Sequence, residues 1–349
     1  MDRKYWIIKM NVALLGLPAS GKKTLFTLLT GRHLVHGRKD TETVEGQAPV
    51  RDPRVSTIAG ICKPERVKYA ETTFLLCPDV VSAAHREWTE PARRSDLLCL
   101  VVRAFKDPSV YHTAGSVDPE RDHSDLQSEL ILADLEIVEK RLERIGKEKR
   151  SGQTPPQAQE EQALAKCHST LEAGKGVTEA ALDEQELAAL RTLGLLTLKP
   201  ILWTWNVDDR DVKDGGTPFT IACKIEQEIM EIQDPEERIA YLKELGLSSS
   251  GVDRMNAAAY DALGLMSFYT MGPDEVRAWT IRKGSTAPTA AGKIHSDIER
   301  GFIRVEIVKY DDLIALGNEN SVKLAGKSLV KGKDYIIADG DICHFRFNV

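Results

Sequence analysis

A glycine-rich loop close to the start of the chain constrains the fold more than any other feature. The stretch "ALLGLPASGKKTLF", residues 13–26, places Gly16, Gly21 and Lys22 in the spacing G-x-x-x-x-G-K. The apolar residues before the loop predict a buried strand, and the residues after it predict a helix. This context favours a phosphate-binding loop, in which backbone N–H groups and a lysine surround phosphate oxygens. A strand-to-helix turn that binds nothing is the alternative.

The position after Lys22 departs from the pattern. It should carry a serine or threonine hydroxyl, which holds Mg²⁺ in P-loop proteins, but here it is Lys23. Such a lysine either neutralises phosphate charge in place of the metal ion or points to solvent. Thr24 is then the candidate metal ligand of the loop. The candidate phosphate-binding residues are Gly16, Ala19, Ser20, Gly21, Lys22, Lys23 and Thr24.

Strand-like apolar runs alternate with helical segments along much of the chain. The first predicted helix spans residues 22–30 and ends near Gly31. The apolar runs lie at residues 11–15, 72–76, 96–102 and 199–207. Because strands that alternate with helices are typical of a parallel sheet covered by helices, we predict an α/β fold with a mostly parallel sheet.

A helical hairpin is predicted to interrupt this alternation. Apolar residues recur at steps of 4 and 3 in the heptad pattern of a coiled coil, at Ile131, Leu135, Val138, Leu142 and Ile145. Glycine and two prolines in "KEKRSGQTPPQAQEEQ" then break the helix, and the spacing of Leu164, Cys167 and Leu171 predicts a returning one. Asp183 and Glu186 have the spacing of a capping box. Two ordinary surface helices are the alternative to an inserted arm.

The last part of the chain has a different sequence pattern, with short apolar stretches and turn residues. "VRAWTIRKG", "GFIRVEIVKY" and "DYIIADGDICHFRFNV" predict short strands separated by turns, and so a small α+β domain. The predicted boundaries are 11–123 and 195–274 for the nucleotide-binding domain, 124–194 for the helical hairpin and 275–349 for the C-terminal domain.

Bulk composition excludes several classes of protein. The net charge of -6 does not indicate a general nucleic-acid-binding surface, and no apolar run approaches the roughly 18 residues of a membrane span. The opening "MDRKYWIIKMNVALLGLP" leads into the glycine loop and predicts a buried strand rather than a signal peptide. The six cysteines form no C-x-x-C pair, which indicates neither a structural metal nor disulfides and favours a cytoplasmic protein.

The motifs together resemble a known family. "GLPASGKKTLF", "SELILADLEIVEKRLER" and above all "YDALGLMSFYTMGPDEVRAWTIRKG" resemble the YchF proteins, also called Obg-like ATPases, and the similarity runs from about residue 11 to the last residue. The resemblance implies a P-loop domain of translation-factor type, a coiled-coil insertion and a C-terminal TGS domain of β-grasp fold. It also implies ATP binding in preference to GTP, slow hydrolysis and association with ribosomes.

The family's base-reading motif, Asn-x-x-Glu, is matched in part. Asn206 is present, and Asp209 stands where the glutamate would be, so the candidate base-binding residues are Asn206, Val207 and Asp209. A carboxylate in N-x-x-D accepts from two guanine N–H groups, which keeps GTP open beside ATP. A plain turn after a buried strand would also account for "NVDD".

The family's Asp-x-x-Gly switch motif is absent. In "LLCPDVVSAAHREW", Cys77 stands where the metal-associated aspartate would be, and Val80 stands where the switch glycine would be. These losses predict binding of a purine nucleotide with slow or impaired hydrolysis, and a weakened Mg²⁺ site. Two alternatives remain: an RNA- or ribosome-binding scaffold with a vestigial nucleotide site, and an active ATPase in which Asp79 and Thr24 take shifted roles.

Two groups of aromatic residues have either a functional or a packing explanation. Trp203 and Trp205 alternate on one predicted strand, where one of them faces the base or both pack on the sheet. Arg300 and Arg304 flank Phe302, a combination that holds RNA in other proteins and that core packing explains equally well.

Overall fold

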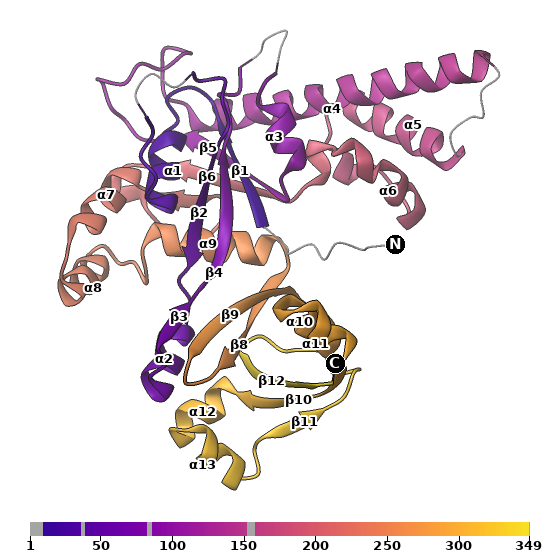
Figure 1. Ribbon diagram of the computed structural model, residues 1–349. Coiled ribbons are helices and arrows are strands. Elements are labelled where there is room, and N and C mark those ends of the chain that lie inside the picture. Colours follow the sequence, from indigo (N-terminus) through magenta and orange to yellow (C-terminus); the bar gives the residue numbers. More distant parts are fainter. Residues whose placement is uncertain (1–9, 36–38, 82–85, 152–157, 349) are drawn as a thin grey trace. The chain divides into compact units, whose positions relative to one another are not determined.

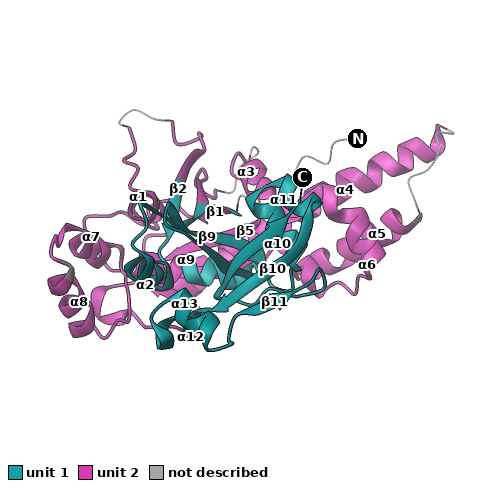
Figure 2. Ribbon diagram, turned by 60° about the horizontal axis from the view of Figure 1, so that its bottom comes forward, with its two compact units in different colours: residues 1–10, 47–72, 256–349 teal, residues 11–46, 73–255 magenta. Residues whose placement is uncertain are grey.

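The computed structural model describes residues 10–35, 39–81, 86–151 and 158–348. The chain divides into two compact units, which Figure 2 colours separately. The large unit comprises the described residues of 11–46 and 73–255. The small unit comprises those of 47–72 and 256–349, together with Met10. The predicted three-part boundaries divide the chain differently and stay a prediction.

A largely parallel sheet forms the centre of the large unit. Its strands follow the order β2, β4, β1, β5, β6, β7, and β2 and β4 carry residues of both units (Figure 1). β1 is parallel to β5, β5 to β6 and β6 to β7, which confirms the predicted α/β fold. The strands are β1 (Met10–Gly16), β2 (Val44–Val50), β4 (Ala70–Leu76), β5 (Leu97–Arg103), β6 (Ile201–Asn206) and β7 (Phe219–Ile221).

Helices connect these strands. The helix predicted at residues 22–30 is α1, which ends where Gly31 adopts a φ of +66° that favours glycine. α9 continues from the large unit into the small one. The helices are α1 (Lys22–Thr30), α3 (Thr89–Arg94), α4 (Pro119–Arg150), α5 (Ala158–Glu172), α6 (Glu184–Leu190), α7 (Cys223–Glu231), α8 (Pro235–Glu244) and α9 (Gly251–Ala262).

α4 and α5 form the predicted helical hairpin (Figure 1). Its core combines the predicted heptad positions of α4 with the apolar residues of the returning helix, and α6 adds Leu190. The Arg141 guanidinium clamps the hairpin through two bonds to Glu160, at 2.6 and 2.8 Å. The predicted capping box of Asp183 and Glu186 starts α6, as expected. The two helices are therefore an arm with a core of its own.

A second sheet forms the small unit. Its strands follow the order β11, β10, β12, β8, β9, β3, with β12–β8 and β3–β9 parallel and the remaining pairs antiparallel. Alanines of α10 pack into its core. The strands are β3 (Arg66–Lys68), β8 (Leu265–Met271), β9 (Glu275–Arg282), β10 (Phe302–Lys309), β11 (Leu329–Lys331) and β12 (Asp341–Phe347). The helices are α2 (Pro53–Cys62), α10 (Ala287–Ile294), α11 (Ser296–Arg300), α12 (Tyr310–Leu316) and α13 (Glu319–Leu324).

The last predicted strand is shorter than the sequence suggested. Residues 334–340 form a loop with an isolated bridge at Ile336, and β12 begins at Asp341. The buried Asp341 carboxylate organises this loop, because it accepts from the Tyr335 hydroxyl and from the Ala338 amide, each at 2.9 Å. It also pairs with the Lys309 ammonium at 2.6 Å. A buried carboxylate requires such partners, and the segment that supplies two of them is a loop and not a strand of the sheet.

The structure also bears on the cysteines, on membrane-spanning helices and on metal-binding groups. The six cysteines are free thiols. Within the described ranges, no helix is long and apolar enough to cross a bilayer. Within the same ranges, no group of three or more His, Cys, Asp or Glu side chains is arranged to hold a metal ion.

We predict that Leu164→Ala loosens the arm. Leu164 is fully buried in the hairpin core, so its truncation should cost about 2–5 kcal/mol of local stability. Hydrogen exchange should speed up across α4 and α5 while β1 and β5 keep their protection. Leu132→Ala is the matched control, because Leu132 lies half-exposed on α4. Equal effects of the two substitutions would contradict the assigned core.

Candidate functional site

The glycine loop between β1 and α1 requires both of its glycines. Gly21 has a φ of +91°, and a Cβ there would lie 2.1 Å from the Asn206 side-chain nitrogen. A Cβ on Gly16 would lie 2.6 Å from the Val101 carbonyl oxygen. Ala19 also adopts a positive φ, of 60°. The loop is thus held in a tight conformation against β5 and β6, with its amides at the start of α1.

Asn206, at the end of β6, connects three segments. Its side-chain amide donates to the Ser20 carbonyl at 3.2 Å, and its side-chain oxygen accepts from the Cys223 amide at 3.1 Å. The side chain is buried, so these bonds are shielded from water. Asn206 therefore positions the glycine loop. Sequence reasoning missed Cys223, although its place directly after β7 puts it at the same edge of the sheet.

Lys22 is paired with Asp79 within the large unit. The lysine side chain is 3% exposed and the aspartate 24%, and the Lys22 ammonium also lies 3.5 Å from the Gly16 carbonyl oxygen. Burial lowers the pKa of Lys22, and Asp79 opposes that shift because it favours the charged ammonium. The lysine predicted to contact phosphate is therefore already in contact with a carboxylate of its own chain.

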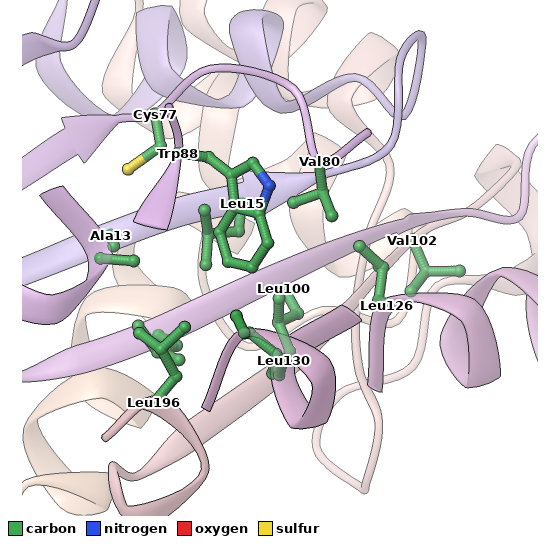
Figure 3. Close-up of a cluster of buried hydrophobic side chains, with 13 residues drawn as sticks. Ala13, Leu15, Cys77, Val80, Trp88, Leu100, Val102, Leu126, Leu130 and Leu196 are labelled. Carbon is green, nitrogen blue, oxygen red and sulfur yellow. The ribbon is translucent and has the colours of Figure 1, made fainter. Parts of the chain in front are cut away.

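The segment after β4, residues 77–81, is held in place by apolar burial. Val80 is 1% exposed and packs in a cluster with Leu15 and Trp88, as Figure 3 shows. Its amide donates to the Gly16 carbonyl at 3.0 Å, so this segment lies against the start of the loop. Cys77 is buried in the same cluster, and burial raises the pKa of its thiol to about 12. The thiol is therefore neutral at pH 7 and supplies no charged metal ligand.

Lys23 lies on the exposed side of α1. Its ammonium is 2.6 Å from an Asp40 carboxylate oxygen, in an ion pair that solvent reaches on both sides. Thr24, the candidate metal ligand, is half-buried in the first turn of the same helix. The Ser20 hydroxyl is buried and, among the described residues, has no hydrogen-bond partner. Ser20 and Thr24 therefore lie at the glycine loop and the first turn of α1, whereas the Lys23 side chain extends toward Asp40, in the segment after α1.

The remaining base-binding candidates lie in different environments. Val207 is buried with residues of α7, and its amide donates to the Ile221 carbonyl at 2.9 Å. Asp209 is exposed at the start of a short 3-10 helix, Asp209–Asp211. Its neighbour Asp208 accepts from the Lys106 amide at 3.2 Å, a contact that sequence reasoning missed. The Val207 side chain and amide are therefore occupied within the protein, whereas Asp209 is exposed to solvent.

The aromatic candidates outside the loop are explained by packing. The Trp203 ring contacts the His123 ring in a tilted arrangement with 3.8 Å between centroids, and Trp205 packs against two apolar clusters. Phe302 is buried in the core of the small unit. Its flanking arginines are exposed and pair with carboxylates, Arg300 with Asp297 and Arg304 with Glu306.

The fold and the loop define a class of protein. A parallel sheet with a glycine loop between β1 and α1, and a loop-binding asparagine at the end of β6, is the arrangement of a P-loop NTPase domain. Residues 265–348 match the family model YchF-GTPase_C, described as "Protein of unknown function (DUF933)".

Full-length relatives identify the family. The "Ribosome-binding ATPase YchF" of Haemophilus influenzae is 36% identical over 96% of this chain and 98% of its own length. The protein of the same name from Bacillus subtilis is 36% identical over 97% and 100%. The solved structure of the Schizosaccharomyces pombe YchF GTPase matches with a TM-score of 0.80 and 30% identity, covering 97% of this chain and 98% of that one. The chain belongs to the YchF family.

We predict that Val80→Gly destabilises the large unit. The substitution empties a buried site and adds backbone freedom, at a cost of about 2–4 kcal/mol. The urea midpoint followed by tryptophan fluorescence should fall accordingly. Val81→Gly, at a neighbouring residue that is 44% exposed, should cost about 1 kcal/mol or less. A similar midpoint for both variants would show that the segment is not anchored by Val80.

We predict that Cys77 resists alkylation in the native chain. Its thiolate is negligible at pH 8 because the pKa is raised to about 12, while Cys62 is only half-buried. Mass spectrometry after iodoacetamide treatment should find Cys62 modified at least about ten times faster than Cys77, and both equally fast in urea. Fast native labelling of Cys77 would show that this segment opens.

Proposed function

We propose that this chain binds a purine nucleotide at the glycine loop, with ATP favoured over GTP. The observation that carries the proposal is the double contact of Asn206, which holds the loop backbone at the carboxyl edge of the sheet. Ligands of open α/β sheets bind at this edge. The loop amides and Lys22 would receive the phosphates. The names of the relatives, ribosome-binding ATPases and a GTPase, support the same class of ligand.

The preference for ATP rests on the names of the curated relatives, which are called ATPases, and not on the candidate base-binding residues. Asn206 uses its amide on the protein itself, so a base would meet the exposed segment that follows it. The Asp209 carboxylate is free to swing toward a guanine edge, which keeps GTP as the competing ligand. Calorimetry with the two nucleotides decides between them.

Hydrolysis is proposed to be slow or impaired. The neutral Cys77 thiol and the Lys23 ammonium stand where a metal site needs a carboxylate and a hydroxyl, so these residues do not fit Mg²⁺ as a full site would. Thr24 is left as a hydroxyl donor beside the phosphates. Val80 is buried at the switch position, so a γ-phosphate has no freely moving amide to attract there.

A cytoplasmic role at the ribosome or on RNA completes the proposal. The ribosome part of this proposal is supported by the names of the relatives that align over nearly the whole chain, which are called ribosome-binding. The competing function is a ribosome- or RNA-binding scaffold with a vestigial nucleotide site. The two differ in whether nucleotide binding depends on Lys22.

We predict that Lys22→Ala lowers nucleotide affinity at least about tenfold, because the phosphates lose a buried ammonium. Calorimetry with ATP and with GTP measures the change. Lys175→Ala is the matched control, since Lys175 is exposed in the arm region and pairs with Glu179. Equal affinity of the natural chain, Lys22→Ala and Lys175→Ala, or no binding by any of them, would favour the scaffold.

We predict that Lys23 makes nucleotide affinity independent of Mg²⁺. The natural chain should bind ATP about equally well in Mg²⁺ and in EDTA, because the Lys23 ammonium neutralises phosphate charge once it leaves Asp40. Lys23→Ser supplies the missing hydroxyl, so its affinity should become Mg²⁺-dependent. Strict Mg²⁺ dependence of the natural chain would overturn this role for Lys23.

A further inference from the structure

The contact between Asp79 and Lys22 has a consequence that rests on the proposed nucleotide binding. We propose that Asp79 is a tethered competitor of the nucleotide phosphates, which holds the Lys22 ammonium until a nucleotide displaces it. The carboxylate and a phosphate oxygen have the same charge and seek the same N–H donors. The nucleotide-free site is thereby closed by a group of the chain itself.

The backbone on both sides of Asp79 is fixed, which keeps its carboxylate in place. The Cys77 amide donates to the Leu14 carbonyl at 3.2 Å, and the Val80 amide donates to the Gly16 carbonyl at 3.0 Å. Both side chains are buried in the cluster shown in Figure 3. Asp79 therefore loses little conformational freedom when it pairs with Lys22, because burial of its neighbours has already ordered the segment.

The Lys22 ammonium cannot contact the Asp79 carboxylate and a nucleotide phosphate at the same time. Lys22 is nearly buried, and its ammonium is confined between Asp79 and the Gly16 carbonyl oxygen. A phosphate that reached the ammonium beside an ionised Asp79 would place two negative charges together in a poorly solvated site. The carboxylate must therefore turn away toward the solvent that already reaches a quarter of its side chain.

A different role for the same residue predicts the opposite result. If Asp79 held Mg²⁺ beside the phosphates, its removal would weaken nucleotide binding in Mg²⁺. If it competes with the phosphates, its removal strengthens binding, and does so most clearly in EDTA, where no cation bridges the two groups. The sign of the change therefore separates a competitor from a metal ligand.

The test measures ATP affinity by calorimetry for the natural chain, Asp79→Asn and Asp79→Ala, each with Mg²⁺ and with EDTA. The alanine variant covers the case in which asparagine still bonds Lys22. Glu90→Gln is the matched control, because it removes one negative charge from an exposed pair with Arg94 on α3. Melting curves confirm that each variant is folded.

We expect both Asp79 variants to bind ATP at least about threefold more tightly in EDTA, with the control unchanged. In the absence of nucleotide, N-hydroxysuccinimide acetate should also modify Lys22 faster in these variants, because the freed amine loses the group that keeps it charged. If the variants bind ATP as tightly as the natural chain does, or more weakly, Asp79 does not compete with the phosphates. The proposal of nucleotide binding would be unaffected. No binding by any chain overturns both proposals.

Discussion

The two bonds of the Asn206 side chain are the constraint on which the arrangement of the site depends. One amide group joins the loop after β1 to the end of β6 and to the start of α7, although the loop lies 186 residues before Asn206. Gly21 has no Cβ at the point where Asn206 meets the loop, so the contact and the glycine require each other. A buried amide with both of its ends satisfied is stable only while all three stretches keep their places.

The segment after β4 is held beside the glycine loop by apolar packing, whereas Asn206 acts through hydrogen bonds. A polar, mobile switch would expose backbone amides to a phosphate, but here Val80 and Cys77 join a core that includes Trp88 and Leu126. Apolar burial stabilises the segment and at the same time restricts its motion. Asp79 lies between these two buried residues in the sequence, and their packing and backbone bonds hold the chain that carries its carboxylate to Lys22.

In the small unit, residues 47–72 from the N-terminal part of the chain join the C-terminal strands. β3 pairs with β9, and α2 is capped by Asp52, which also accepts from the hydroxyl of Tyr269 on β8. Arg54 bonds both Asp52 and Asp339 through its guanidinium. These charge-assisted bonds hold the segment firmly, since each partner is at least partly shielded from water.

Local pattern in the sequence was enough to predict the elements with strong periodicity. The glycine loop and its helix, the buried run of β5 and the heptad positions of the arm follow from spacing and side-chain type, which act within a few residues. β3 was not predicted, because its three exposed residues carry no apolar pattern and become a strand only through pairing with β9. The loop before Asp341 was not predicted either, because the Asp341 carboxylate that bonds it is buried and paired with Lys309, which is distant in the sequence.

For the candidate site, the sequence by itself determined which residues were candidates, because residue type and spacing are local properties. Only the tertiary structure decided their partners. It brought Asp79 to Lys22, Cys223 to Asn206 and Val80 into a core. Such contacts join residues far apart along the chain, and whether a polar group is paired or a charge is buried depends on what the fold places beside it.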